Sequence, residues 1–461
     1  MINSKWYLLL LSGSVCFAAD PGLVVSNTAS LSVGRISHAI AHLPNDMVVC
    51  FGGHNPSFTA LNSAAVYNPV SNSFTYLTMN SPRDTAAFAR LGDGTYLLAG
   101  GYTSSGMSGY ITAEVFDPVA MTFVAVGNLS RFRAAGQAAT LASGNVLIAG
   151  GWWTWNDAPT VADLYDPQAR TFTAVGSLNT PRTHPLVLPC SDGGAVVVGG
   201  YTPTGGSLGD AKPEYFNPST KLFSAMSTSL AAGETNWNVS WQPSVVDDFK
   251  LSDGRYVALA WRTVTGGTEY ALFLFSPSDK TFARVPMNPA FPISSRYGRS
   301  NLTLDAANST AYVIGIDSAI SPYGFQLSSI NLLTGATRNT TFASLPQTYT
   351  TFSPGPGAAT FHHGKVFVTG GTTSNNYGGV PWTEMLSFGP LPSSVQIALY
   401  AGLTITGEVG KTYRILASDT LSSTNWQTLT DIVLPSSPYL WYDSQSATNH
   451  SRFYYVQLMT P

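Results

Sequence analysis

Charged residues are scarce in this 461-residue chain: they make up 10% of it, against about 25% in an average soluble protein. The net charge is −3 and no run of basic residues occurs, so the sequence gives no electrostatic support for nucleic acid binding. Past the N-terminus, no apolar stretch reaches the roughly 18 residues that a membrane-spanning helix needs. Cysteine is also rare, and a chain of this length can build a core without disulfides.

Glycine and proline are abundant instead, with 43 and 29 residues, and aromatic residues make up 12% of the chain. Helical proteins carry Glu, Lys and Arg on their exposed faces, and this chain is poor in all three. A composition of Gly, Pro, Ser, Thr and aromatics is typical of many short strands joined by tight turns. The composition therefore predicts an all-β protein.

Residues 1–19 combine one positive residue, Lys5, with an apolar run and a small-x-small triplet, Cys16-Phe17-Ala18. This pattern is typical of a secretory signal peptide, so we expect a secreted protein, extracellular or on the cell surface. A buried N-terminal strand is the alternative interpretation. Removal of the segment would leave only Cys50 and Cys190, which we expect to be buried, unpaired thiols of different repeats.

Gly-Gly pairs recur at a spacing near 50 residues, at 52–53, 100–101, 150–151 and 199–200. Each pair follows an apolar, β-rich run. An arginine stands seventeen positions before each pair, as Arg35, Arg83, Arg133 and Arg182. A turn-forming segment such as Gly92-Asp93-Gly94 lies between the arginine and the glycines. Strand, tight turn and strand in this order predict a β-hairpin.

A second pattern follows each hairpin. An aromatic residue, then Asn, Asp or Ser, then proline form a turn, and a phenylalanine stands seven positions after the first aromatic. The first aromatics are Tyr67, Phe116, Tyr165, Phe216 and Phe275. We expect the aromatics to flank the turn on two more strands, so that each unit holds four strands. Weaker copies with longer spacings continue to Gly370-Gly371, and the count of hairpins favours seven units rather than six.

Four-stranded units of this period resemble kelch repeats, each of which forms one blade of a β-propeller. The resemblance covers residues 22–390 and implies an all-β, seven-bladed propeller; the units are also similar to the blades of the central domain of galactose oxidases. The seventh unit ends at Gly389-Pro390 without a fourth strand, and residues 22–34 resemble the fourth-strand segments of other units. We therefore expect strand 23–31 to close the last blade, which leaves no free edge at the seam.

The repeat pattern stops before residues 391–461. In this region Gly410, Tyr413 and Ile415, followed by Trp426 and later Arg452-Phe453-Tyr454, resemble a small β-sandwich module found at the C-termini of secreted proteins of Verrucomicrobia and related bacteria. The resemblance implies a structural or surface-presentation role without chemistry of its own.

The similarity to galactose oxidases implies a copper ion held by two Tyr and two His, with a Cys crosslinked to one Tyr. The matching Tyr-His pair is absent, because Pro354 stands ten residues before the turn glycine Gly364. His362-His363 lie at the hairpin turn itself, and the C-terminal region offers only His450. We therefore expect no copper, no other cofactor and no oxidase activity.

Other catalytic patterns are also missing. The seven histidines supply no complete zinc-ligand set, because only His38 and His42 have a His-x-x-x-His spacing. The Gly-x-Ser-x-Gly match at residues 205–209 lacks the strand-to-helix context that a nucleophile motif requires. Asp247 and Asp248 are adjacent, and neighbouring side chains of a strand point to opposite faces. We expect them to be solvated or turn residues rather than a general acid/base pair, and we assign no catalytic or metal-binding residue.

The connections that follow the Gly-Gly pairs and those that begin with the arginines are expected to open on one face of a propeller. This face gathers aromatic and cationic residues, and the candidate ligand-binding set is Tyr102, Trp152, Trp153, Trp155, Tyr201, Trp237, Trp241, Arg83, Arg133 and Arg182. Aromatic rings suit the C–H faces of sugars, and Trp, Tyr and Arg are equally common anchors in protein interfaces. Alternatively, the arginines tie neighbouring blades together and the aromatics fill the central channel.

The sequence thus predicts a secreted, monomeric, non-enzymatic binding protein whose partner is a glycan or another extracellular protein. The alternative is a carbohydrate-active enzyme related to copper radical oxidases.

Overall fold

The computed structural model describes residues 23–103, 110–152, 160–202, 212–227, 230, 236–240, 242, 244–265, 267–288, 301–317, 324–342, 355–362, 364–372, 383–388, 402–418, 426–442 and 453–459. The segment 1–19 that the sequence predicts to be a signal peptide lies outside them. The chain divides into two compact units, Met1–Gly389 and Pro390–Pro461. Regular structure in the described part is all strand apart from one short 3-10 helix. No described helix has the length and apolar character needed to cross a membrane.

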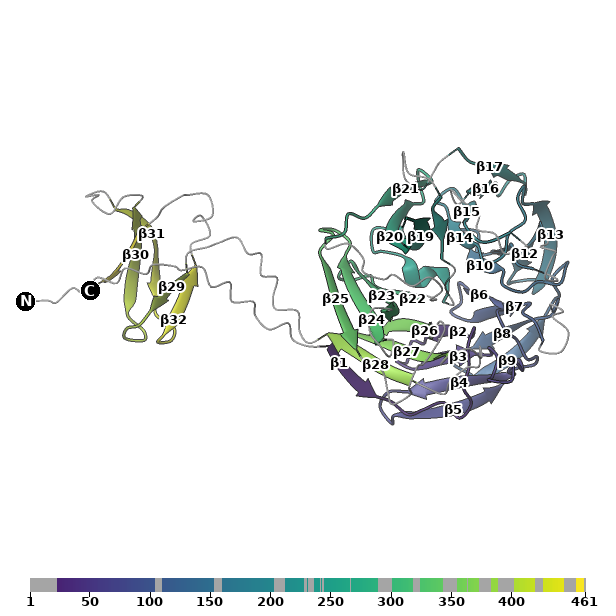
Figure 1. The fold of residues 1–461 in the computed structure, drawn as a ribbon, viewed down its shortest axis with the longest axis horizontal. Coiled ribbons are helices and arrows are strands. Elements are labelled where there is room, and N and C mark those ends of the chain that lie inside the picture. The colour runs from purple at the N-terminus through teal and green to yellow at the C-terminus, as the bar shows by residue number, and fades with distance from the viewer. Residues whose placement is uncertain are drawn as a thin grey trace, which may run out of the picture. The chain divides into compact units, whose positions relative to one another are not determined.

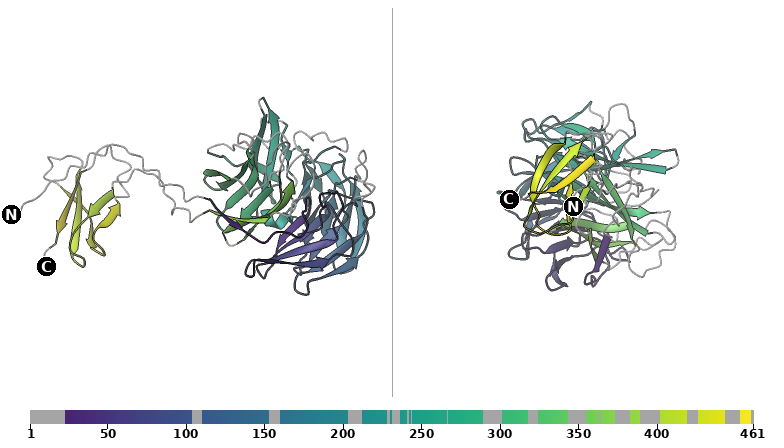
Figure 2. Two further views of the ribbon diagram at one scale, coloured as in Figure 1. Left: turned by 60° about the horizontal axis from the view of Figure 1, so that its bottom comes forward. Right: turned by 90° about the vertical axis from the view of Figure 1, so that its left-hand side faces the viewer.

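The first unit contains seven four-stranded antiparallel sheets in its described part. They form a propeller-like ring in which one edge strand of each sheet lies near the centre and the other at the rim (Figures 1 and 2). The first four sheets follow the Gly-Gly repeats. The first sheet contains β2 (Ala39–His42), β3 (Val48–Phe51), β4 (Ser63–Asn68) and β5 (Ser73–Thr78), and the second contains β6 (Ala87–Arg90), β7 (Tyr96–Ala99), β8 (Ala113–Asp117) and β9 (Thr122–Val126). The third sheet contains β10 (Gln137–Thr140), β11 (Val146–Ala149), β12 (Val161–Asp166) and β13 (Thr171–Ser177). The fourth contains β14 (Leu186–Pro189), β15 (Ala195–Val198), β16 (Glu214–Phe216) and β17 (Phe223–Ala225).

Several strands of the other three sheets are longer, with eight to ten residues, and the connections that lead from one of these sheets to the next are also longer, as the longer repeat spacing predicts. They are β18 (Asn238–Val239), β19 (Tyr256–Val264), β20 (Gly267–Ser276) and β21 (Thr281–Arg284); β22 (Asn301–Asp305), β23 (Thr310–Asp317), β24 (Gly324–Asn331) and β25 (Thr337–Phe342); and β26 (Gly355–His362), β27 (Lys365–Thr372) and β28 (Thr383–Phe388) with β1 (Leu23–Asn27). Strand β1 pairs antiparallel with β28, from Leu23 opposite Phe388 to Asn27 opposite Glu384. The start of the described chain thus supplies the outer strand of the last sheet, although the strand ends four residues before the expected Leu31.

The aromatic pairs seven residues apart lie directly opposite each other across the two outer strands. Tyr67 pairs with Phe74 and Phe116 with Phe123, with ring centroids 5.2 and 4.8 Å apart. The turn between them is held by the Asx residue, because Asn68 Oδ1 accepts hydrogen bonds from the two backbone N–H groups that follow the proline. The predicted arrangement of aromatics flanking an Asx-Pro turn is confirmed.

The Gly-Gly pairs are required where neighbouring sheets touch. Gly52 has a φ of +58°, and a Cβ on it would lie 2.2 Å from the carbonyl oxygen of Arg83 on the next sheet. A Cβ on Gly370 of β27 would likewise lie 2.2 Å from the carbonyl oxygen of Arg35 in the first repeat. The close approach is therefore repeated across the junction of the last and first sheets, where the ring closes.

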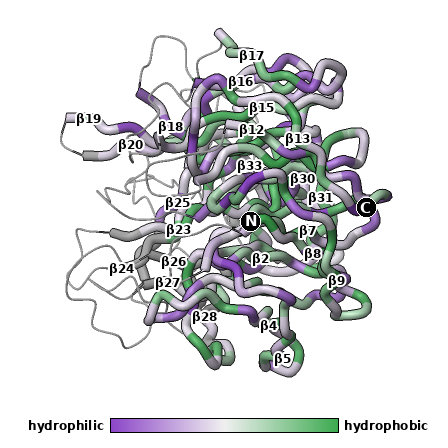
Figure 3. Tube along the Cα trace, turned by 90° about the vertical axis from the view of Figure 1, so that its right-hand side faces the viewer, coloured by the Kyte–Doolittle hydropathy of each residue, from purple (hydrophilic) through white to green (hydrophobic). Residues whose placement is uncertain are grey.

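The core of the first unit lies between the faces of adjacent sheets. Middle strands such as β15 are buried along their whole length. Figure 3 shows their hydrophobic character. Because both faces of such a strand are covered by neighbouring sheets, charged residues have few places on the strands, which accounts for the low charge content.

The second unit has two small antiparallel sheets in its described part: β29 (Gly402–Ile405) with β32 (Tyr439–Tyr442), and β31 (Gln427–Val433), β30 (Thr412–Ser418) and β33 (Phe453–Leu458) in that order. Its core is formed by Ile405, Tyr413, Ile415 and Leu434. The unit thus has a small core of its own, with residues from both sheets.

Candidate functional site

The recurrent arginines lie inside the sheets. Arg83, Arg133 and Arg182 are between 0% and 2% exposed. Arg83 Nη1 donates to the carbonyl oxygen of Gly100 at 2.6 Å, and its Nε donates to Glu114 Oε1 at 2.6 Å. Arg133 and Arg182 likewise donate to the glycine carbonyl seventeen residues later and to an acid on the third strand. Burial lowers the pKa of each guanidinium, opposed by its carboxylate. These three predicted ligand residues therefore do not reach the surface.

Arg35 is the exception among these arginines. It is fully buried and its Nη1 donates to the carbonyl oxygens of Gly52 at 3.0 Å and Ser63 at 3.1 Å. In the strand register Ala65 occupies the position that Glu114 has in the next sheet, so the first repeat lacks the acid. Burial lowers the pKa of Arg35.

A chain of backbone hydrogen bonds joins the segments that follow the arginines. The N–H of Thr85 donates to the Ser37 carbonyl at 3.3 Å, that of Ala135 to Thr85 at 2.9 Å, and that of His184 to Ala135 at 2.8 Å. All four residues have φ between +49° and +58°, a conformation that non-glycine residues rarely adopt. Their repetition fixes the positions of successive sheets relative to each other on this side of the ring.

Aromatic side chains lie on the same side, immediately after the Gly-Gly pairs. Tyr102 and Trp152 occupy matching positions of adjacent sheets, and their rings lie 5.3 Å apart. Tyr201, at the same position of the next sheet, lies 6.2 Å from Trp261 of the sheet after that. All four side chains are half-buried. We call them the aromatic arc; Trp261 was missed in the sequence because it stands in the weakest repeat, where Ala260-Trp261 replaces the glycines.

The first sheet has a histidine in place of the aromatic residue. His54 Nδ1 lies 2.5 Å from Asp84 Oδ2, with side chains 7% and 0% exposed. The ring of His54 also stacks on Phe58 at 5.4 Å, and Asp84 forms a bridge with Tyr102 of its own sheet. The histidine is therefore held in one orientation beside the aromatic arc. The sequence does not reveal this pair, because its members are thirty residues apart on neighbouring sheets.

Trp237 does not belong to the arc. It is 1% exposed and packs edge-on against Phe273 at 5.2 Å. The guanidinium groups of Arg262 and Arg284 lie over its ring, 4.6 and 5.2 Å from the centroid, and both arginines bind Glu269. Trp237 is thus a core residue beneath a partly exposed charged cluster. The remaining predicted ligand residues, Trp153, Trp155 and Trp241, lie outside the described residues.

Asp247 and Asp248 correct a premise of the sequence analysis. They lie in the 3-10 helix η1 (Val246–Phe249), not in a strand, and both line one pocket. The argument from strand alternation therefore does not apply. Asp247 is exposed, as expected of a solvated residue, whereas Asp248 is half-buried.

The part of the chain that the structure describes contains no group of three or more His, Cys, Asp or Glu side chains that could hold a metal ion. Cys50 and Cys190 are free and buried, as expected, and burial raises the pKa of their thiols to about 11 and about 12. The described residues do not fit a copper site of the galactose oxidase kind. Pro354, His363 and His450, on which the sequence argument also rests, lie outside them.

No protein-family model and no curated protein sequence matches the chain. Among solved structures, the chain is similar to a fungal alcohol oxidase of the AA5 family in complex with copper, with 13% sequence identity and a TM-score of 0.52. The match covers 95% of this chain and 99% of the oxidase. At this identity the likeness shows the fold: an all-β, propeller-like architecture of the galactose oxidase type.

Proposed function

We propose that the first unit is a seven-bladed kelch-type β-propeller and that the protein is a secreted, monomeric, non-enzymatic binding protein for a glycan. The C-terminal unit, as a small β-sandwich, would serve presentation rather than recognition. The observation that carries the proposal is the aromatic arc, in which four half-buried rings from consecutive sheets follow one another on one side of the ring.

Aromatic rings of this kind suit a chain of sugar units, because each ring offers a flat apolar surface to the C–H face of a pyranose. Polar groups for the hydroxyls lie at one end of the arc, where the partly exposed Arg262–Glu269 pair follows Trp261 on the β19–β20 hairpin. At the other end, the buried His54–Asp84 pair supports Tyr102 from beneath rather than reaching a ligand. A protein partner would use the same rings.

A glycan array probed with the full chain, followed by calorimetry on the strongest sugar, tests the proposal. Tyr102→Ala/Trp152→Ala should weaken binding about tenfold or more, since each aromatic contact contributes roughly 0.5–1.5 kcal/mol beyond its buried area. Tyr76→Ala, an exposed aromatic on the outer strand β5, is the matched control and should bind normally. Equal affinity in the double variant would remove the arc from the site.

The likeness to a copper-containing oxidase points to the competing function, a carbohydrate-active oxidase. Copper reconstitution with an EPR spectrum and a hydrogen peroxide assay separates the two. A radical copper signal with peroxide release on sugars or alcohols would overturn the binding proposal.

A further inference from the structure

The helix η1 belongs to an insertion that enters the centre of the ring. In the first sheets the two inner strands are joined by short turns, but β18 and β19 are separated by residues 240–255. Ser244 in this insertion forms a parallel bridge with Ile40 of β2, and the N–H of Leu302 on β22 donates to Gln242 Oε1 at 2.8 Å. The insertion thus contacts the first and sixth sheets while belonging to the fifth.

Apolar residues anchor the insertion. Val245 packs into the core cluster of the first two sheets, Val246 into that of the third to fifth, and Phe249 into that of the fifth and sixth. The polar residues between and beside them are left facing a cavity of about 230 Å³. The cavity is on the side of the β2–β3 and β6–β7 turns, away from the aromatic arc, because His42 and Arg90 end their strands at those turns.

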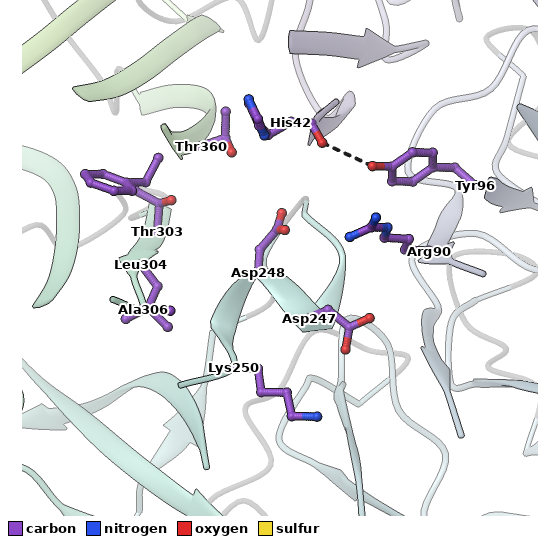
Figure 4. A pocket seen from close by; sticks show the side chains of 11 residues that line it. His42, Arg90, Tyr96, Asp247, Asp248, Lys250, Thr303, Leu304, Ala306 and Thr360 are labelled. Atoms are coloured by element: carbon purple, nitrogen blue, oxygen red, sulfur yellow. Dashed lines mark hydrogen bonds between the residues drawn. The ribbon is translucent and has the colours of Figure 1, made fainter. Parts of the chain in front are cut away.

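Figure 4 shows how the side chains meet. Asp247, Asp248 and Lys250 come from the insertion, and His42, Arg90 and Thr360 come from three different sheets. Asp248 points into the space between His42 and Arg90 (Figure 4). Residues from separate segments of the chain therefore line one cavity.

Asp248 carries the inference. Its carboxyl accepts a hydrogen bond from the Ser244 side chain, but its Oδ2 is buried and has no hydrogen-bond partner. Burial, and then the neighbouring Asp247, raise the pKa of Asp248 to about 7, while Arg90 acts in the opposite direction. A buried acceptor without a donor is uncommon in a native protein and calls for an explanation.

We propose that this cavity is a second binding site, which takes a neutral polyhydroxylated ligand of monosaccharide size through a hydroxyl that donates to Asp248 Oδ2. Two acidic and two basic side chains line the cavity, so its charges balance once Asp248 is ionised and no free ion is favoured. A hydroxyl group can donate to Asp248 and accept from Arg90 or Thr360. The volume lies below the roughly 300 Å³ at which sites for larger ligands begin.

Saturation-transfer difference NMR on the full chain tests the site with glucose, galactose, mannose and inositol as neutral probes, and with glycine and acetate as charged ones. We expect at least one neutral probe to bind with a Kd on the order of 1 mM. Asp248→Ala should weaken it tenfold or more. Asp253→Ala, an acidic residue of an exposed turn, is the matched control and should bind normally.

Thr360→Val gives a second test that keeps shape and charge, and should weaken the same probe severalfold. The Tyr102→Ala/Trp152→Ala protein should bind it unchanged, which separates this site from the aromatic arc. The proposal would be overturned if no neutral probe gave a signal, or if glycine or acetate bound better than the neutral probes. It would also be overturned if Asp248→Ala and Thr360→Val bound the probe as tightly as the natural protein.

Discussion

The guanidinium of Arg83 donates to the carbonyl oxygen of Gly100, seventeen residues later, and to the carboxylate of Glu114 on the third strand of the same sheet. The backbone carbonyl of Arg83 in turn accepts the N–H of Gly53 on the preceding sheet at 2.9 Å. One residue thus binds its own sheet through its side chain and the neighbouring sheet through its backbone. The recurrent arginine is a structural element of the ring, and the surface aromatics are separate from it.

The first prediction follows from the natural difference between Arg83 and Arg35. Arg83→Met leaves Glu114 as a buried charge without its partner, so we expect a loss of about 3–5 kcal/mol in unfolding free energy. Glu114→Ala leaves Arg83 without a carboxylate, which is the situation of Arg35 beside Ala65 in the natural protein. We therefore expect a clearly smaller loss of unfolding free energy in this variant. Denaturant unfolding of both variants measures the difference. Equal losses would contradict the prediction, because they would show that Arg83 needs its carboxylate as much as Glu114 needs the guanidinium.

A second prediction concerns Gly100. Its φ is +70°, and a Cβ would lie 2.2 Å from the carbonyl oxygen of Arg133, so Gly100→Ala forces adjacent sheets apart. We expect it to cost about 3 kcal/mol or more, combining backbone strain with overpacking. Gly92→Ala is the control, because nothing lies within 4 Å of its Cβ position and its φ is not positive. Thermal unfolding should show a large drop in Tm for the first variant and almost none for the second.

Much of the ring could be predicted because its determinants are local in sequence and repeat. Tyr67 and Phe74 face each other because only a short Asx-Pro turn separates them. The acid partner of the arginine was not recognised, because it varies in type and distance: Glu114 stands 31 residues after its arginine, Asp163 stands 30 after, and Ala65 replaces it in the first repeat.

The candidate sites were harder to predict because they join residues of different repeats. The contact of His54 with Asp84 exists only because neighbouring sheets meet at the Gly-Gly pair. Asp247 and Asp248 lie in an insertion with no counterpart in the other repeats, so the strand periodicity used for them did not apply. The sequence also did not distinguish buried from accessible tryptophans. Trp152 is half-buried beside Tyr102, whereas Trp237 is in the core.

A third prediction uses that contrast. Trp237→Ala should cost about 3–5 kcal/mol in unfolding free energy, because it removes a large buried ring on which two guanidiniums stack. Trp237→Phe keeps most of the buried area and should retain glycan affinity, whereas Trp152→Phe should lower it. Calorimetric titration of the two Phe variants distinguishes a core residue from a contact residue. A greater loss of affinity in Trp237→Phe would contradict this assignment.

The last prediction is a pH dependence. The pKa of Asp248 is raised from 3.8 to about 7 by burial and by the neighbouring Asp247, so folding favours its protonated form. Arg90 acts in the opposite direction, and His42 and Lys250 also line the pocket. Its contribution is most favourable below pH 4, declines as the pH rises through the window from 4 to 7, and is a full penalty above 7.

Asp248→Asn removes that penalty. At about 1.4 kcal/mol per unit of pKa, reduced by the partial exposure of the side chain, we expect the variant to be more stable than the natural protein by about 1–3 kcal/mol at pH 8. At pH 4 the two proteins should be nearly equal. Asp253→Asn is the control, in which the pH dependence of stability has the opposite sign. Arg255 lowers the pKa of Asp253, so the ionised Asp253 stabilises the folded protein and this stabilisation is lost as the pH falls. Denaturant unfolding between pH 4 and 8 measures both; identical pH slopes for the natural protein and Asp248→Asn would show that this carboxyl is not protonated in the folded state near neutral pH.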